Sequence, residues 1–208
     1  FDVVFSAYDV WRSYYRSVLA GAAGHTYGCE PIRQVYRAGD RIHGADDVAS
    51  MMTWEEGLSL PGASQLKLLK DQLLSRSYFT RVPAQERVRP YRQEPAWPDG
   101  MNVGLDFAGQ QNTDPIARIS AARCRDGHYV MAYMPVRQIL YLDVTGLASD
   151  RLRLSVFDPE TGELQDQREF DTPRRDTRQR TYATHVDDGM LLYIPKRDLD
   201  TFFIIDAI

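Results

Sequence analysis

Two stretches within the first 80 residues repeat their hydrophobic positions with the period of an α-helix. The earlier one predicts a helix from about Ala7 to Ala20, because its apolar residues recur three and four positions apart on one face. These apolar positions are Val10, Trp11, Tyr14, Tyr15, Val18 and Leu19. Ser6 and Asp9 form a capping-box pattern at the start of this helix, and Gly21 is a natural stop.

The later stretch predicts a second helix from Pro61 to about Leu74. Its apolar stripe consists of leucines: Leu66, Leu69, Leu73 and Leu74. Pro61 suits the first turn of a helix, and Ser59 can cap it.

A run rich in glycine and alanine, Gly21 to Gly28, follows the first predicted helix. Small residues allow backbone elements to approach closely, so we expect a short buried strand here that carries His25, Thr26 and Tyr27. The order helix, strand, loop, helix is typical of α/β folds. A parallel strand needs neighbours on both sides and cover on both faces, so we expect the missing strands upstream or on a second chain.

The pattern changes at residue 83. Four prolines interrupt residues 83–100, and we predict a linker there, since this density of proline blocks helices and central strands. Residues 101–208 then carry short apolar runs separated by turn signals such as Arg125-Asp126-Gly127, as in an antiparallel β-sandwich. The predicted strands are Ile119 to Arg123, His128 to Met134, Leu140 to Val144, Leu152 to Phe157, Met190 to Ile194 and Thr201 to Ile205.

Composition narrows the possible partners. The chain has 208 residues, a formal net charge of -4 and a sequence pI of about 5.6, which argues against general binding of nucleic acid or of anionic membranes. The arginines between residues 174 and 180 are interrupted by Asp176 and lack interleaved aromatic residues, so we interpret them as a solvated loop. No apolar run reaches the roughly 18 residues that a membrane helix needs. Cys29 and Cys124 have no metal-ligand spacing, so we expect two free thiols and no metal site.

Several sequence pieces together resemble the last part of the barrel in apiosidase-type glycoside hydrolases of family 140. They are Asp9-Val10-Trp11-Arg12, the run Gly21-Ala22-Ala23-Gly24-His25-Thr26-Tyr27-Gly28, Trp54, Leu60-Pro61-Gly62-Ala63-Ser64-Gln65-Leu66 and Leu73 to Pro83. The second half of the chain is similar to the small β-domain that follows that barrel, labelled a putative collagen-binding domain of a collagenase. Its landmarks are Asp126-Gly127-His128-Tyr129, Phe157 to Gly162 and Phe202 to Asp206.

The resemblance implies a fold that is α/β plus all-β. Residues 1–82 would be the final βα portion of a (β/α)8 TIM barrel, with Gly24 to Gly28 as its eighth strand; residues 83–100 would be the linker and residues 101–208 the β-sandwich. Active sites of such barrels lie at the C-terminal ends of the strands. His25, Tyr27 and Trp54 would therefore bind a carbohydrate substrate, which needs hydrogen-bonding groups beside an aromatic surface.

The resemblance also implies where catalysis would arise. Glycoside hydrolysis needs two carboxyl groups and no cofactor, and in the family they come from strands ahead of Phe1. Glu30, Glu55, Glu56 and Asp40 are interpreted as surface groups, so no catalytic acid is assigned to this chain. Secretion or export to a bacterial periplasm is what the family suggests for location.

Other interpretations stay open. A histidine in such a strand can be satisfied by backbone carbonyls, Tyr27 can pack in the core against Trp11 or Tyr15, and Trp54 can be a lid without ligand contact. Two functional classes therefore remain. The chain is the C-terminal portion of a glycoside hydrolase acting on a polysaccharide or oligosaccharide side chain, or it is a non-catalytic β-sandwich module with a barrel remnant that binds carbohydrate or protein.

Overall fold

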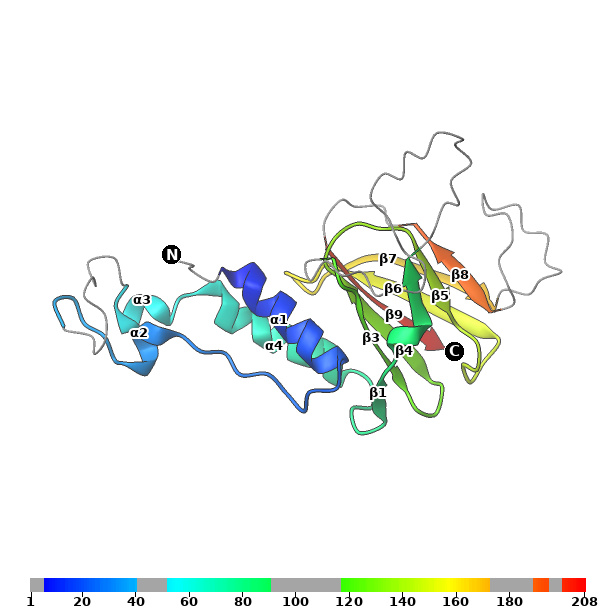
Figure 1. Cartoon of the computed structure of the whole chain (residues 1–208), viewed down its shortest axis with the longest axis horizontal. Coiled ribbons are helices and arrows are strands. Elements are labelled where there is room, and N and C mark those ends of the chain that lie inside the picture. The colour runs from blue at the N-terminus through cyan, green and yellow to red at the C-terminus, as the bar shows by residue number, and fades with distance from the viewer. Residues whose placement is uncertain (1–5, 41–51, 91–116, 173–188, 195–199) are drawn as a thin grey trace, which may run out of the picture.

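The computed structural model describes residues 6–40, 52–90, 117–172, 189–194 and 200–208. Helices gather at one end of the molecule and strands at the other (Figure 1). The helices are α1 (Ala7–Leu19), α2 (Glu30–Arg33), α3 (Trp54–Gly57) and α4 (Pro61–Leu74), with a 3-10 turn over Gln85–Arg87. The strands are β1 (Arg81–Pro83), β2 (Val88–Pro90), β3 (Ser120–Cys124), β4 (Tyr129–Met134), β5 (Leu140–Asp143), β6 (Arg151–Phe157), β7 (Leu164–Asp171), β8 (Met190–Tyr193) and β9 (Thr201–Ala207). No helix in these ranges is long and apolar enough to cross a membrane.

Both long helices form where the sequence predicts them. At the start of α1, one carboxylate oxygen of Asp9 accepts hydrogen bonds from the backbone N–H of Ser6 at 2.9 Å and from its hydroxyl at 2.7 Å. The cap predicted for α4 was wrong: Leu60, not Ser59, is the N-cap residue. Proline forces the residue before it into extended backbone, so the helix can begin only at Pro61.

All strand pairs are antiparallel, and they form two sheets in the described part of the chain. One sheet has six strands in the order β1-β3-β4-β9-β6-β7, and the other has three in the order β2-β5-β8. The six predicted strands are confirmed as β3, β4, β5, β6, β8 and β9. Gly127 closes the predicted β3–β4 hairpin with φ of 78°, a left-handed conformation that favours glycine.

Three strands were not predicted. β1 and β2 lie at and within the first residues of the proline-rich stretch, and each pairs along one side only, at the edge of its sheet. Edge strands tolerate proline because one row of their N–H groups needs no partner. The third, β7, is the other edge of the six-stranded sheet, and almost all its side chains are exposed. Asp176 and the arginines between residues 174 and 180 lie outside the described residues.

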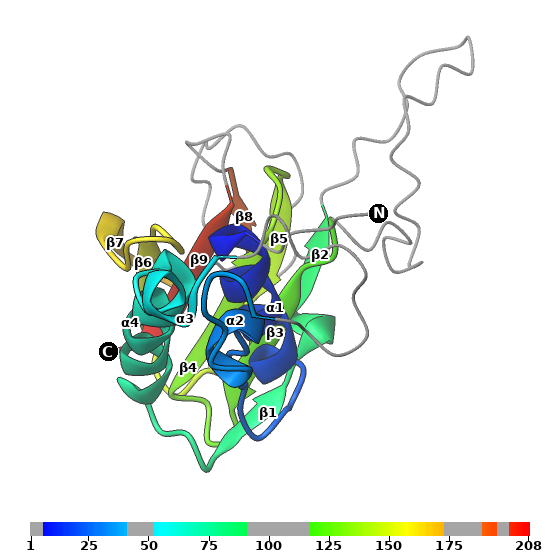
Figure 2. The ribbon, with the colours of Figure 1, turned by 90° about the vertical axis from the view of Figure 1, so that its left-hand side faces the viewer.

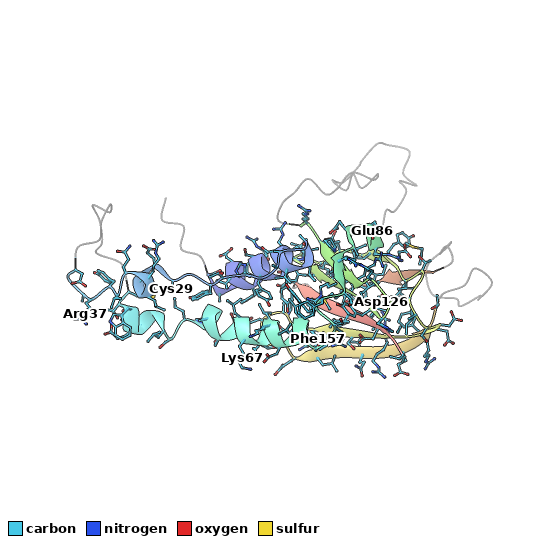
Figure 3. All side chains as sticks on the ribbon, turned by 90° about the horizontal axis from the view of Figure 1, so that it is seen from below. Cys29, Arg37, Lys67, Glu86, Asp126 and Phe157 are labelled. Carbon is cyan, nitrogen blue, oxygen red and sulfur yellow. The ribbon has the colours of Figure 1, made fainter. Side chains whose placement is uncertain are left out.

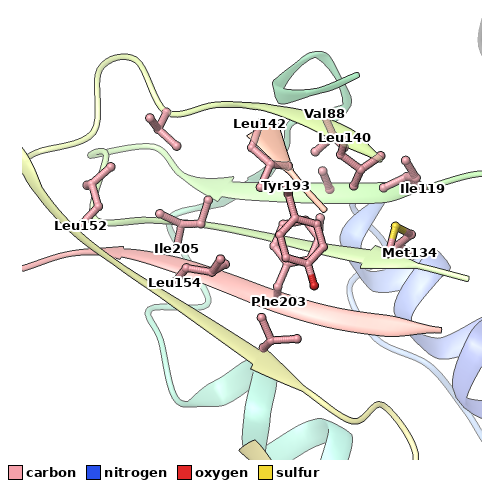
Figure 4. Packing of buried hydrophobic residues seen from close by; sticks show 14 residues of the cluster. Val88, Ile119, Met134, Leu140, Leu142, Leu152, Leu154, Tyr193, Phe203 and Ile205 are labelled. Atoms are coloured by element: carbon pink, nitrogen blue, oxygen red, sulfur yellow. The ribbon is translucent and has the colours of Figure 1, made fainter. Parts of the chain in front are cut away.

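One hydrophobic core lies between the two sheets (Figure 4). Tyr193 of β8 packs its ring on Phe203 of β9, with ring centroids 5.3 Å apart. Leu140 and Leu142 of β5 enter the same core from the three-stranded sheet. Burial of this apolar surface joins the two sheets into one unit.

The opposite face of the six-stranded sheet is covered by α1 and α4 (Figure 2). Tyr15 of α1 is fully buried, and its ring stacks on Tyr133 at 4.8 Å and on Phe202 at 4.7 Å between centroids. Its hydroxyl donates to Gln72 of α4 at 2.7 Å. Trp11 of α1 donates from Nε1 to Asp200 at 3.0 Å. The buried residues of α1 thus pack on the six-stranded sheet and on α4.

Candidate substrate-binding segment

Residues 22–29, which follow α1, run back along the helices toward α2 and α3 (Figure 1). The strand expected at Gly24 to Gly28 is not formed, since no strand in the described ranges pairs with it. A strand is defined by hydrogen bonds to a neighbour, and a single extended segment cannot supply them. We call these residues the 22–29 segment. Its start is held by Tyr78, whose hydroxyl donates to the carbonyl of Ala23.

The turn that leads into the segment depends on Gly21. Its φ of 103° is unfavourable for residues with a side chain, and a Cβ atom there would lie 2.9 Å from Cγ of Pro83. The glycine therefore lets the chain reverse direction against β1.

His25 is half-buried and packs against α1. Its ring meets the ring of Tyr14 edge to face, with centroids 5.5 Å apart and an interplanar angle of 79°. Partial burial lowers the pKa of His25 below its ordinary value, which favours the neutral imidazole. A neutral imidazole can donate one hydrogen bond and accept another.

Tyr27 is also half-buried and packs against the start of α4. A Cβ atom on Gly62 would lie 3.3 Å from the Tyr27 ring and 3.2 Å from Val10, so glycine makes room for the ring. Burial raises the pKa of the Tyr27 phenol, and the Cys29 thiol adds to this. The expected alternative of a core position against Trp11 or Tyr15 does not match these contacts.

Trp54 begins α3, in a separate pair of short helices beyond the ends of α1 and α4 (Figure 1). Thr53 caps α3, and the Trp54 backbone N–H donates to the carbonyl of Tyr36 at 2.9 Å. The indole Nε1 is buried and has no hydrogen-bond partner in the described ranges. Sulfur of Cys29 packs against Gly57 of α3, where a Cβ atom would come within 3.2 Å.

The three predicted residues thus follow one another from the 22–29 segment to α3, but their rings do not contact one another. Cys29, near the end of the molecule opposite Asp126 (Figure 3), lies between Tyr27 and α3. No ring contact joins Trp54 to His25 or Tyr27 among the residues that the structure describes. Tyr14, which sequence analysis placed only on an apolar helix face, contacts the His25 ring with its own ring.

Three of the four nearby carboxylates, Glu30, Glu56 and Asp40, form hydrogen bonds with residues close to them in sequence. Glu30 is exposed, and its hydrogen bonds to Arg33 and then Gln34 lower its pKa. Glu56 accepts from the backbone of Thr53 at 2.7 Å as part of the α3 cap. Asp40 accepts from the backbone N–H of Arg37 at 2.9 Å.

Cys29 and Cys124 are both free thiols, as predicted. In the described ranges, no group of three or more histidine, cysteine or acidic side chains is arranged to hold a metal ion. The 22–29 segment carries hydrogen-bonding and aromatic side chains, His25, Thr26 and Tyr27.

Comparisons with known proteins match the two parts of the chain separately. Residues 2–80 match the family model described as "Apiosidase-like, catalytic domain", and residues 106–192 match "Putative collagen-binding domain of a collagenase". No protein with a curated description matches the chain in sequence.

Two solved structures share the fold. One is described as a glycoside hydrolase; it is 24% identical to this chain, its TM-score is 0.71, and the matched region includes 99% of this chain. The other is a glycoside hydrolase of family 5 from Bacteroides vulgatus ATCC 8482, with 23% identity and a TM-score of 0.71, and covers 98% of this chain. The chain spans only 38% and 36% of these two proteins. The resemblance to an apiosidase-type glycoside hydrolase followed by a collagenase-type β-domain is confirmed, each part over its own residues.

Proposed function

We propose that this chain is the C-terminal portion of a glycoside hydrolase that acts on a side chain of a polysaccharide or oligosaccharide. The observation that carries the proposal is the match of residues 2–80 to the apiosidase-like catalytic domain. The catalytic carboxylates would lie upstream of Phe1 or on another chain, in keeping with the local engagement of Glu30, Glu56 and Asp40.

In this proposal the fold is the closing βα portion of a (β/α)8 barrel followed by a β-sandwich. The order of elements supports this fold: α1 precedes the extended 22–29 segment and α4 follows it, as helices precede and follow the last strand of such a barrel along the chain. The segment would become the eighth strand once neighbouring strands pair with it. The two sheets around a shared core support the β-sandwich.

We further propose that the 22–29 segment, with His25 and Tyr27, forms one wall of the substrate site. Trp54 would close the site from the loop beyond it. A sugar offers hydroxyl groups at its edges and C–H groups on its faces. A half-buried neutral imidazole, a phenol and an indole ring provide groups of both kinds.

Hydrolysis by the complete protein tests the proposal. It should release free sugar from at least one member of a panel of aryl glycosides and of plant and bacterial polysaccharides, with an aryl apioside as the first candidate. In that protein, His25→Ala should lower kcat/KM by about tenfold or more while the melting temperature changes by about 2 °C or less. A loss of activity that merely follows a loss of folded protein would show that His25 has a structural role only.

A second candidate is a non-catalytic binding module, favoured by the match of residues 106–192 to a binding-domain description. Binding to a glycan or to collagen without release of product would favour it. Both faces of the six-stranded sheet are covered at their centre, by the helices and by the second sheet. Such a module would therefore have to use its edges or loops.

A further inference from the structure

The side chains of the 22–29 segment alternate between two environments. His25 and Tyr27 are half-buried against α1 and α4, whereas Gly24, Thr26 and Gly28 are exposed. In extended backbone, successive side chains point to opposite sides. The segment therefore presents one face to the helices and another face away from them.

The face turned away from the helices is open. A Cβ atom built on Gly24 or on Gly28 would meet no atom within 4 Å. Neither glycine has a positive φ, so neither is required by backbone conformation. Glycine at such a position allows another molecule or element to approach the backbone closely.

Thr26 is the only side chain that the open face carries between these two glycines. Its hydroxyl has no hydrogen-bond partner among the described residues and can donate one hydrogen bond and accept two. In a barrel strand the side chain nearest the C-terminal end that faces the interior is the one closest to the substrate. Because Gly28 has no side chain, Thr26 is the interior-facing side chain nearest the C-terminal end of this segment.

From this alternation we propose that Thr26 is a substrate-binding residue, which hydrogen-bonds a sugar hydroxyl, and that Gly28 leaves room for the sugar ring. His25 and Tyr27, in the same wall, also hold the segment on α1 and α4. The assignment rests on the proposed glycoside hydrolase function and refines its binding site.

Two substitutions test the hydrogen bond in the complete protein. Thr26→Val removes the hydroxyl while keeping the shape of the side chain, and it should lower kcat/KM on the cleaved glycoside by about tenfold. Thr26→Ser keeps the hydroxyl and should retain most of the activity. Unchanged activity in Thr26→Val, with the same melting temperature, overturns the proposal.

Thiol labelling tests the orientation separately. In a Cys29→Ser background, Thr26→Cys should react with a maleimide much faster than Tyr27→Cys, and the released sugar should slow the reaction at position 26. Equal rates at the two positions would overturn the proposal that Thr26 faces away from the helices. Slow reaction at both positions would overturn it as well, because other strands would then cover this face. If no glycoside is cleaved, the proposed function fails, and free apiose or a bound glycan from an array replaces the product in this assay. Absence of protection then overturns substrate contact by Thr26.

Discussion

Replacing Tyr15 by alanine tests whether the β-sheet holds α1 in place. The Tyr15 ring is fully buried and stacked between Tyr133 and Phe202, and its hydroxyl bonds to Gln72. Truncating a buried aromatic residue to alanine costs about 3–5 kcal/mol because it removes apolar contacts and leaves a cavity. We expect Tyr15→Ala to lower the free energy of unfolding by about 4 kcal/mol, a large part of the stability of an ordinary domain.

Two control variants separate the parts of this effect. Tyr15→Phe keeps the stacked ring and removes only the hydrogen bond to Gln72, so it should cost about 1 kcal/mol. Leu68→Ala changes a residue of α4 that is 42% exposed and should cost about 0.5 kcal/mol or less.

Urea unfolding, followed by far-UV circular dichroism and by tryptophan fluorescence, measures these changes. Coincident transitions for the two probes would show that helices and sheets unfold together. The reasoning is refuted if Tyr15→Ala lies within about 1 kcal/mol of the unmodified chain. Loss of the helical signal well before the sheet unfolds would refute it too, because the helices would then be an independent unit.

Two further predictions concern the 22–29 segment and the turn before it. Gly21→Ala should destabilise the fold by about 1–3 kcal/mol, since the new Cβ atom meets Pro83 in a left-handed backbone, whereas Gly28→Ala in open space should cost about 0.5 kcal/mol or less in the same urea assay. Burial lowers the pKa of His25 from its ordinary value of 6.5, so the unfolded chain binds more protons at that residue. The contribution of His25 to the free energy of unfolding should therefore be complete above pH 6.5 and should be lost as the pH falls toward the pKa of His25 in the folded chain. His25→Gln should reduce this loss. An NMR titration that places the pKa of His25 above 6.5 would contradict the predicted direction of the pH dependence.

The elements that could be predicted from the sequence are those with a strong apolar period or distinctive turn residues. The two long helices have both an amphipathic stripe and a defined start, and the β3–β4 hairpin has Gly127 at its turn. The strand β7 has no such pattern, since only Leu164 and Phe170 are apolar among its residues. Its charged side chains instead pair across to β6, as Glu169 does with Arg153 at 3.0 Å.

The packing of the helices on the sheet had a signal in the sequence. All six residues of β4, Tyr129 to Met134, are buried. Tyr129, Met131 and Tyr133 belong to the core under the helices, whereas Ala132 and Met134 belong to the core between the sheets. An unbroken apolar run is typical of a strand covered on both faces, whereas an amphipathic strand has one face in solvent. The apolar run of β4 indicated that a layer covers each face of this strand. It did not indicate whether that layer is a helix or a sheet, because both can bury apolar side chains.

The candidate site could be predicted only as a segment. His25 and Tyr27 were expected to line the substrate site, and that assignment stays a prediction. Their direction depends on contacts with Tyr14 and Gly62, which lie 11 and 35 positions away in sequence. Local pattern therefore locates the segment, while long-range packing decides which of its side chains faces a ligand.

The arrangement of Tyr14 and Tyr15 links the β-domain to the candidate site. These consecutive residues of α1 lie in edge contact, with ring centroids 6.2 Å apart, and face different neighbours. Tyr15 is clamped by the six-stranded sheet, whereas Tyr14 packs on His25. Because packed interiors resist deformation, a shift of α1 on the sheet would displace His25 and the Thr26 face with it. Under the proposed function, substitutions in the α1-facing surface of the β-domain should therefore alter KM as well as stability.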